Sequence, residues 1–213
     1  MIIAIDGPAA AGKGTLARRL ADHFGLAHLD TGALYRAVAL LMLRAGDRPN
    51  DPAAALAAAK RVGEINAGDP ALRDETTGAA ASTVSTYPPV REALLDYQRQ
   101  FAAYPPGGRS GAVIEGRDIG TVVCPDADHK IFVDASPEVR ARRRLDELRQ
   151  RGEAADYATV LGELKERDHR DRTRTISPLV PAADAYLLDT TELDIDSAFA
   201  AAVAFISRRS RNG

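Results

Sequence analysis

The sequence predicts an α/β fold whose parallel sheet is covered by helices on both faces. Short apolar segments of strand length alternate along the chain with longer segments of helical periodicity. This alternation is typical of parallel strands joined by helical crossovers. In such folds ligands bind at the carboxyl ends of the strands, so the polar residues that follow the strands are the first candidates for a functional site.

Five apolar segments are predicted to form the sheet, and each is short enough for a strand buried on both faces. They are Ile2–Ile5, Leu26–Leu29, Ala112–Ile114, Lys130–Val133 and Ala185–Leu188. Four of them lead into polar residues, which include Asp6, Asp30, Asp118 and Asp134. We therefore expect most of the chemistry near these four positions.

Apolar residues recur at helical spacing between the predicted strands. The first stripe comprises Leu16, Leu20 and Phe24, and Gly25 is placed to end its helix. Ser136 and Pro137 are a cap residue and a first-turn proline for a later helix. The other helices are predicted from 33 to 44, from 53 to 65, from 87 to the prolines at 105–106, from 137 to 152, through the stripe at 157–164, and from 195 to 206. From residue 207 onward we expect a frayed basic tail.

The segment from 46 to 86 is the least core-like part of the chain. Gly46, Pro49 and Pro52 break the preceding helix, and the alanine-rich segment after them offers little bulk to bury. We expect a core over 1–45 and 87–213, a mobile insert over 46–86, and a short lid at about 150–157 between two helices.

Composition and charge limit the class of function. The 213 residues suit one domain with a small appendage, and the formal net charge of −2 gives no reason to expect nucleic acid or a membrane surface as partner. The single cysteine excludes an intrachain disulfide and suits a reducing compartment. Because no apolar run approaches membrane-spanning length and no signal peptide is expected, we predict a cytoplasmic protein.

The strongest functional signal is the glycine-rich stretch after the first strand, which we call the phosphate loop. Strand, glycine-bounded loop and helix follow in the order that a nucleotide-binding loop requires. The glycines let successive N–H groups point at a polyphosphate, and the helix N-terminus adds partial positive charge. The loop residues are Gly7, Pro8, Ala9, Ala10, Ala11, Gly12, Lys13, Gly14 and Thr15.

Two side chains of the phosphate loop carry specific predictions. Lys13, one of only four lysines among the 28 Lys and Arg residues, is predicted to lie exposed in the loop and to reach the β- and γ-phosphates. The hydroxyl of Thr15 is predicted to ligate Mg²⁺. The loop departs from the usual pattern because Gly14 stands between the lysine and the hydroxyl residue. The alternative is an ordinary strand–turn–helix with a solvated lysine.

A dense charged cluster covers residues 165–174. Taken alone it fits a solvated, salt-bridged helix end, and the arginines at 140 and 142–144 fit the outer face of a helix. A nucleotide-dependent switch is disfavoured because guanine-recognition and switch sequences are missing from the strand ends. A kinase for another monophosphate or for a small alcohol stays open at this point.

Six segments of the chain resemble, in order, those of the bacterial cytidylate kinase family of nucleoside-monophosphate kinases. They are DGPAAAGKGT, LDTGALYR, the spacing from Ser82 to Arg91, EGRDIGTVV, KIFVDASPEVRARRR, and ERDHRDRTR with PLxPAADA. The combination of EGRDIGTVV with ERDHRDRTR is narrow to this family. Relative to the family pattern, residues 46–69 look abbreviated.

The resemblance implies a P-loop kinase core, a shortened monophosphate-binding insert over 46–86, and transfer of the γ-phosphoryl group of ATP to CMP or dCMP in pyrimidine nucleotide metabolism. It implies ATP and CMP or dCMP as small-molecule partners, Mg²⁺ as cofactor, a monomer, and no nucleic acid or membrane partner. A 5′-phosphate acceptor is largely dianionic at neutral pH and needs no general base, so arginines and Mg²⁺ would neutralise charge.

The resemblance also implies roles for individual residues. Those in the CMP site would be Arg36, Arg117 and Arg174 at the phosphate, Arg167 and Asp171 at the ribose, and Ser82, Arg91 and Asp118 at the cytosine, with Thr31 and Tyr35 beside them. Those that stabilise the transferred group would be Lys13, Arg167, Arg170 and Arg172. Arg144 would pack on the ATP adenine, with Arg143 as a close competitor. A carboxylate at 118 can accept from the exocyclic amine of cytosine but not from O4 of uracil.

Overall fold

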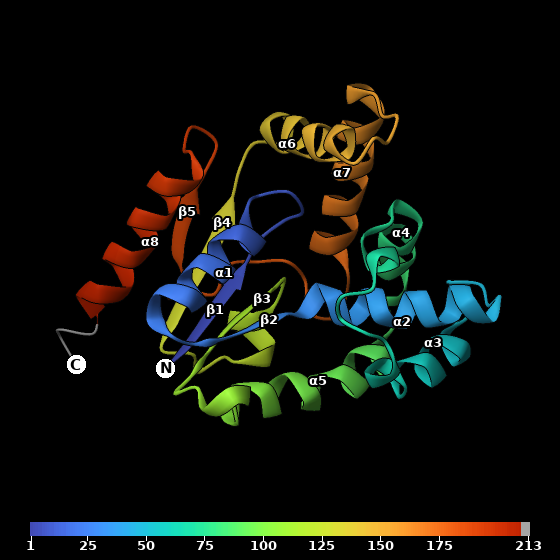
Figure 1. The fold of residues 1–213 in the computed structure, drawn as a ribbon, viewed down its shortest axis with the longest axis horizontal. Helices are drawn as coiled ribbons and strands as arrows, with labels where there is room; N and C mark the ends of the chain where they lie inside the picture. Colours follow the sequence, from blue (N-terminus) through green and yellow to red (C-terminus); the bar gives the residue numbers. More distant parts are fainter. Residues whose placement is uncertain (210–213) are drawn as a thin grey trace. The chain divides into compact units, whose positions relative to one another are not determined.

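The computed structural model describes residues 1–209, and the chain forms two compact units (Figure 1). One unit combines Met1–His28 with the chain from Pro105 onward, and the other is Leu29–Tyr104. The second unit is wider than the predicted insert of 46–86, which lies inside it, because the helices on either side of the insert pack with it. The functional limits of the insert stay a prediction.

The predicted α/β fold is confirmed by a five-stranded sheet flanked by helices. The strands are β1 (Ile2–Asp6), β2 (Ala27–Asp30), β3 (Ala112–Gly116), β4 (His129–Asp134) and β5 (Tyr186–Asp189), in the spatial order β2-β3-β1-β4-β5. The central strand β1 pairs in parallel with β3 and β4, and Asp6 lies opposite Gly116 and Phe132. The segments that follow these three strands therefore start at the same edge of the sheet.

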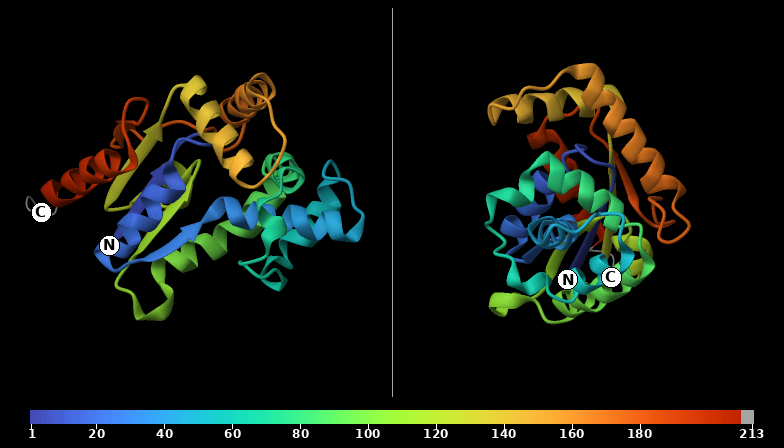
Figure 2. Two further views of the ribbon diagram at one scale, coloured as in Figure 1. Left: turned by 45° about the horizontal axis from the view of Figure 1, so that its top comes forward. Right: turned by 90° about the vertical axis from the view of Figure 1, so that its right-hand side faces the viewer.

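Four helices belong to the first unit: α1 (Lys13–Phe24), α6 (Pro137–Gln150), α7 (Tyr157–Thr173) and α8 (Ile195–Arg209). Its main core joins apolar side chains of the strands to those of α1 and α8, and includes Ile3, Leu16, Val113, Ile131 and Ile206. Helices α6 and α7 lie side by side in Figure 2 and bury a smaller apolar cluster between them. The sheet and these two helices supply the elements of the candidate site.

The ends of these helices follow the predicted capping residues. Gly25 adopts φ +65° and ends α1, and the Ser136 hydroxyl accepts a bond from the N–H of Val139 at the start of α6. The predicted lid of about 150–157 coincides with the connection from α6 to α7, and its closing role stays a prediction. The expected fraying from residue 207 is wrong for 207–209, which continue α8, whereas 210–213 lie outside the described residues.

The second unit contains α2 (Thr31–Ala45), α3 (Pro52–Ala59), α4 (Glu75–Val84) and α5 (Pro88–Ala103), with 3-10 turns at Val62–Glu64 and Pro70–Arg73. The helix predicted over 53–65 ends at Ala59, and α4 is not anticipated from the sequence. The expectation that this region has little to bury is also wrong. Its alanines pack closely against Val38, Met42, Val90 and Leu94, because small side chains let the helices approach one another.

Along residues 1–209, no helix has both the length and the apolar character that crossing a membrane requires.

Candidate active site

The phosphate loop needs its glycines for two different reasons. At Gly7, a Cβ atom would lie 1.9 Å from the carbonyl oxygen of Val133, so only glycine fits beside β4. Gly12 adopts φ +89° immediately before α1, in the left-handed region that glycine tolerates best. Ala10 also has a positive φ, of 58°, although it carries a side chain.

Three carbonyl groups of the phosphate loop accept hydrogen bonds from side chains, one from the loop's own lysine and two from residues outside the loop. Lys13 Nζ donates to the carbonyl of Pro8 at 2.9 Å, Arg140 Nη1 to that of Ala9 at 3.2 Å, and the Thr190 hydroxyl to that of Ala11 at 3.2 Å. In a trans peptide the C=O and the next N–H point in opposite directions. Fixing these carbonyls therefore aims the following N–H groups away from the donors, as an anion-binding nest requires.

The N-terminus of α1 adds positive character to this nest. Gly12, the residue before the helix, makes no side-chain capping bond, and the first turn contains no acidic residue. The partial positive charge of the helix N-terminus is therefore available to an anionic ligand. The arrangement is suited to binding a polyphosphate.

The prediction from the sequence that Lys13 lies exposed is wrong. Its side chain is 7% accessible, and its ammonium group is held on the Pro8 carbonyl within the loop itself. The loop folds back over the lysine because it turns tightly around the start of α1. Reaching a β- or γ-phosphate requires Nζ to exchange this carbonyl for a phosphate oxygen.

Gly14, the unusual residue after the lysine, lies against the buried carboxylate of Glu115. A Cβ atom at position 14 would be 3.4 Å from Glu115 Oε1, and the same oxygen is 3.0 Å from His28 Nε2. The hydroxyl of the loop is instead at Thr15, which is exposed on the first turn of α1.

The donor set near the phosphate loop is compatible with Mg²⁺ that arrives with a nucleotide. Nowhere in residues 1–209 do three potential metal-binding side chains gather. A magnesium ion bound through the exposed Thr15 hydroxyl would therefore take its other ligands from phosphate oxygens and water, as Mg²⁺ commonly does.

Asp6 connects the end of β1 to the segment after β3. Its two carboxylate oxygens accept the N–H groups of Ile119 and Gly120, at 2.7 and 2.8 Å. These residues begin a π-helical turn, Ile119–Val123, directly after Asp118. Burial is the main cause that raises the pKa of Asp6 to about 6, against the lowering effect of the two N–H bonds. The sequence marks Asp6 only as polar and does not reveal this connection.

Arg117, Asp118, Arg167, Asp171 and Arg174 form what we call the acid–arginine cluster. Arg117 Nε donates to Asp171 Oδ2 at 2.8 Å, and Arg174 Nη2 lies 3.8 Å from Asp118 Oδ1. Burial raises the pKa of Asp171. The positive charges of Arg117, Arg167 and Arg174 together lower this pKa by more than burial raises it, so it lies below the usual value. The structure thus brings together five residues that the sequence places up to 57 positions apart (117 to 174).

The buried face of α7 begins with apolar residues and ends with acidic ones. Val160 and Leu164 are followed on this face by Asp168 and Asp171. Asp168 forms a two-bond ion pair with Arg140, which is 1% exposed, at 3.1 and 2.5 Å. The interpretation of 165–174 as only a solvated helix end is therefore wrong for its two inward aspartates, and Arg140 does not belong to an outer helix face.

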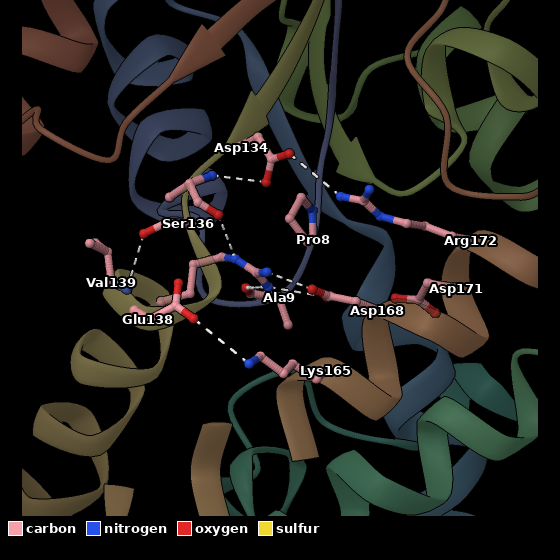
Figure 3. Close-up of polar contacts among 12 residues, drawn as sticks. Pro8, Ala9, Asp134, Ser136, Glu138, Val139, Lys165, Asp168, Asp171 and Arg172 are labelled. Carbon is pink, nitrogen blue, oxygen red and sulfur yellow. Dashed lines mark hydrogen bonds and ion pairs between the residues drawn. The ribbon is translucent and has the colours of Figure 1, made fainter. Parts of the chain in front are cut away.

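The remaining predicted arginines of the first unit differ in their surroundings. Arg172 points toward Asp134 beside Pro8 of the phosphate loop (Figure 3), with 3.5 Å between Nη2 and Oδ2. Arg170 lies 3.9 Å from Glu166 within α7 and is half exposed. The structure therefore brings Arg172 to the phosphate loop.

Arg143 and Arg144 are also distinguished by their contacts. Arg143 Nη2 donates to the carbonyls of Thr190 and Leu193, at 2.6 and 3.3 Å, and so holds the segment after β5. Arg144 pairs with Glu147 of its own helix at 2.9 Å. Of the two candidates for the adenine, Arg143 is thus occupied by main-chain carbonyls.

The other predicted CMP-binding residues belong to the second unit. Arg36 Nη2 donates to Asp30 Oδ2 at 2.6 Å, while the same carboxylate caps α2. The Arg91 guanidinium lies 5.6 Å from the ring centre of Tyr35 and donates to the carbonyl of Ser85. Thr31 and Ser82 are both buried. Within this unit, Arg91 therefore links the Tyr35 ring to the end of α4.

Comparison with known proteins identifies a family over almost the full chain. The sequence model of the family described as cytidylate kinase matches residues 3–208. The cytidylate kinase of Nitrobacter winogradskyi is 58% identical over 100% of this chain and 99% of its own. That of Bradyrhizobium diazoefficiens is 58% identical over 97% and 95%.

Comparison of structures agrees at the level of the fold. An uncharacterised protein from Eubacterium ventriosum aligns over 97% of this chain and 98% of its own, with a TM-score of 0.56. Its sequence identity is 14%, so this likeness concerns the fold alone.

Proposed function

We infer that this chain, which belongs to the cytidylate kinase family, is an ATP-dependent phosphotransferase that acts on CMP. It transfers the γ-phosphoryl group of ATP to CMP and releases ADP and CDP. The structural observation that supports this best is the presence, in one compact unit, of both the phosphate loop and the acid–arginine cluster. One binds polyphosphate through its main chain, and the other offers guanidinium groups to a second phosphate.

For the donor, we propose that residues 7–15 bind the phosphates of ATP. The N–H groups of the loop surround the phosphate oxygens, and Lys13 leaves the Pro8 carbonyl for the β- and γ-phosphates. Arg144 packs on the adenine, since the competing Arg143 is bonded to the carbonyls of Thr190 and Leu193. Thr15, together with the phosphates and water, would hold a Mg²⁺ ion, and such an ion would supply charge neutralisation for the group that is transferred.

For the acceptor, we propose that Arg36, Arg117 and Arg174 bind the phosphate of CMP, and that Arg167 and Asp171 contact its ribose. The acid–arginine cluster contains three arginines and two aspartates, so it carries one more positive than negative charge. A largely dianionic phosphate is attracted by this excess and competes with the aspartates for the guanidinium groups. dCMP lacks the 2′-hydroxyl but presents the same phosphate and base.

We propose that Asp118, Ser82 and Arg91 select cytosine, with Thr31 and Tyr35 alongside. The carboxylate of Asp118 accepts from the exocyclic amine, and the arginine and the hydroxyl donate to the O2 and N3 acceptors. Uracil places an oxygen where the amine stands, so a second acceptor would face the carboxylate. This trio therefore distinguishes a CMP kinase from a kinase for another monophosphate.

The transfer itself needs charge stabilisation rather than a base. The attacking phosphate oxygen is already ionised, so Lys13, Arg167, Arg170 and Arg172 act by stabilising charge on the transferred phosphoryl group. The position of Arg172 beside Pro8 and Asp134 supports this role. Closure of the 150–157 lid would exclude water and so prevent hydrolysis of ATP. Within this proposal the enzyme acts as a cytoplasmic monomer without nucleic acid or membrane partners.

A substrate panel tests the proposed function. ADP release is measured in a coupled assay with ATP and Mg²⁺, using CMP, dCMP, UMP, AMP or no acceptor. We expect fast turnover with CMP and dCMP and slow turnover with the others. A higher kcat/KM for UMP or AMP, or a rate without acceptor equal to that with CMP, would overturn the proposal.

A further inference from the structure

We propose that Arg140 and Asp168 are positioning residues for ATP, because together they fix the direction of the Ala9–Ala10 peptide in the phosphate loop. The proposal rests on the proposed function in one respect, since it takes the loop to be the ATP site. Arg140 lies on the first turn of α6 and Asp168 near the end of α7, so neither belongs to the loop that they control.

The guanidinium of Arg140 joins three separate segments. Its Nε donates to the carbonyl of Ala135 at 2.9 Å, where β4 leads into α6, and its Nη1 donates to the carbonyl of Ala9. Nη1 and Nη2 also donate to the two carboxylate oxygens of Asp168. Ala9 and Asp168 lie close together in Figure 3. Because a guanidinium is planar, the carboxylate and the Ala135 carbonyl determine where the third contact points.

That third contact determines the orientation of one amide. Among residues 1–209 no peptide bond is cis, so the N–H of Ala10 points opposite to the carbonyl of Ala9. The bond from Arg140 holds the Ala9 carbonyl away from the anion-binding nest of the phosphate loop. The N–H of Ala10 consequently points into this nest. A flipped peptide would place a carbonyl oxygen, rather than a donor, against a phosphate.

The backbone at Ala10 explains why such a restraint is needed. Its φ of 58° lies in the left-handed region, which disfavours residues with a Cβ atom. Glycine would adopt this angle without strain, whereas alanine needs surrounding bonds to hold it there. The burial of Arg140, at 1% exposure, keeps water from competing for the Ala9 carbonyl.

The test separates loop positioning from simple stability. Replacing the whole pair, in Arg140→Met/Asp168→Leu, removes both charges and leaves neither unpaired, so the fold is expected to survive. The ATP Kd is measured by calorimetry without CMP, and the thermal midpoint is measured in parallel. We expect the ATP Kd to weaken about tenfold in the folded variant, which corresponds to about 1.4 kcal/mol. The control Arg142→Met, on an exposed residue of the same helix, should leave the ATP Kd unchanged.

A rescue makes the inference specific to the peptide. Adding Ala10→Gly to the pair-replaced variant removes the strain at φ +58°. The ATP affinity should then rise several-fold toward that of a variant carrying Ala10→Gly alone.

If the pair-replaced variant does not fold, Arg140→Lys is used instead, because an ammonium cannot span all three partners. An ATP Kd within twofold of the parent in the folded variant, or no recovery with Ala10→Gly, would overturn the proposal. Lack of CMP phosphorylation by the parent, with these ATP affinities as expected, would instead count against the proposed function alone.

Discussion

The phosphate loop and the acid–arginine cluster recognise phosphate groups by different means. The loop contributes mainly main-chain N–H groups, and its carbonyls are held by Lys13, Arg140 and Thr190. The cluster contributes side chains, in which Arg117 and Arg174 lie beside the carboxylates of Asp171 and Asp118. Both belong to the same compact unit and to the same edge of the sheet.

This difference determines which substitutions each region should tolerate. A main-chain nest depends on backbone angles, so its requirements are for small residues and for the distant side chains that hold it. A side-chain cluster depends on the number and geometry of its charges, so each arginine or aspartate has an individual effect. The donor should therefore be sensitive to supporting residues, and the acceptor to the residues that touch it.

Lys13→Ala is the largest expected effect, because Lys13 is the one charged side chain within residues 7–15. We expect kcat to fall by at least about 10³-fold, from the loss of charge stabilisation on the transferred group. The buried bond to Pro8 is lost as well, so the free energy of unfolding should fall by about 1 kcal/mol. Initial rates and urea unfolding check both parts, with the exposed Lys60→Ala as control. Activity within tenfold of the parent would remove Lys13 from the mechanism.

Arg117→Met should affect the acceptor far more than the donor. Removing the guanidinium that pairs with Asp171 at 2.8 Å should lower kcat/KM for CMP by about 10²- to 10³-fold, with the KM for ATP within about threefold of the parent. Initial rates with each substrate varied in turn measure the two effects. Arg149→Met, on an exposed arginine of α6, is the matched control. Equal losses for both substrates would mean that the two regions are not separable.

Asp118→Asn should change the choice of base rather than the overall rate. An amide can both accept from the amine of cytosine and donate to O4 of uracil, so the CMP preference over UMP should fall about 10- to 100-fold. The ratio of kcat/KM values for CMP and UMP is the measurement, and the exposed Asp126→Asn is the control. An unchanged ratio would place base recognition elsewhere.

The smallest effect concerns the link between the two regions, Asp6. Burial raises its pKa from 3.8 to about 6, so ionisation of Asp6 opposes folding. Stability should therefore fall as pH rises, by about 2 kcal/mol between pH 4.5 and 7.5. Asp6→Asn should lack this slope, although it loses one of the two N–H bonds. The depressed pKa of Asp171 acts in the opposite sense but only below about pH 4. The free energy of unfolding of the parent and of Asp6→Asn is measured in urea across this pH range. Parallel pH dependences of the two proteins would contradict this role of Asp6.

Much of the fold could be predicted from the sequence, because the strands and most helices carry their own periodic patterns. The segment at 130–133 and the cap at Ser136 are both visible without tertiary information. Helix α4 could not be predicted in this way, since its Gly, Ala, Ser and Thr residues give no apolar stripe. Its burial depends on α2, which ends at Ala45, 30 positions before α4 begins.

The site shows the same limit at the level of single side chains. The motif around Arg140 contains four arginines in five positions, and nothing local distinguishes the buried one from the exposed Arg142. The difference lies in Asp168, which is 28 residues away. The burial of Lys13 and the connection made by Asp6 likewise depend on backbone groups whose positions only the folded chain defines.

The most direct measurement follows the phosphorus atoms themselves. The protein is mixed with ATP, Mg²⁺ and CMP, and the phosphorus-31 spectrum is recorded over time. We expect the signals of CDP and ADP to appear together in equal amounts while those of ATP and CMP decline. Formation of ADP with inorganic phosphate, and with CMP unchanged, would contradict it.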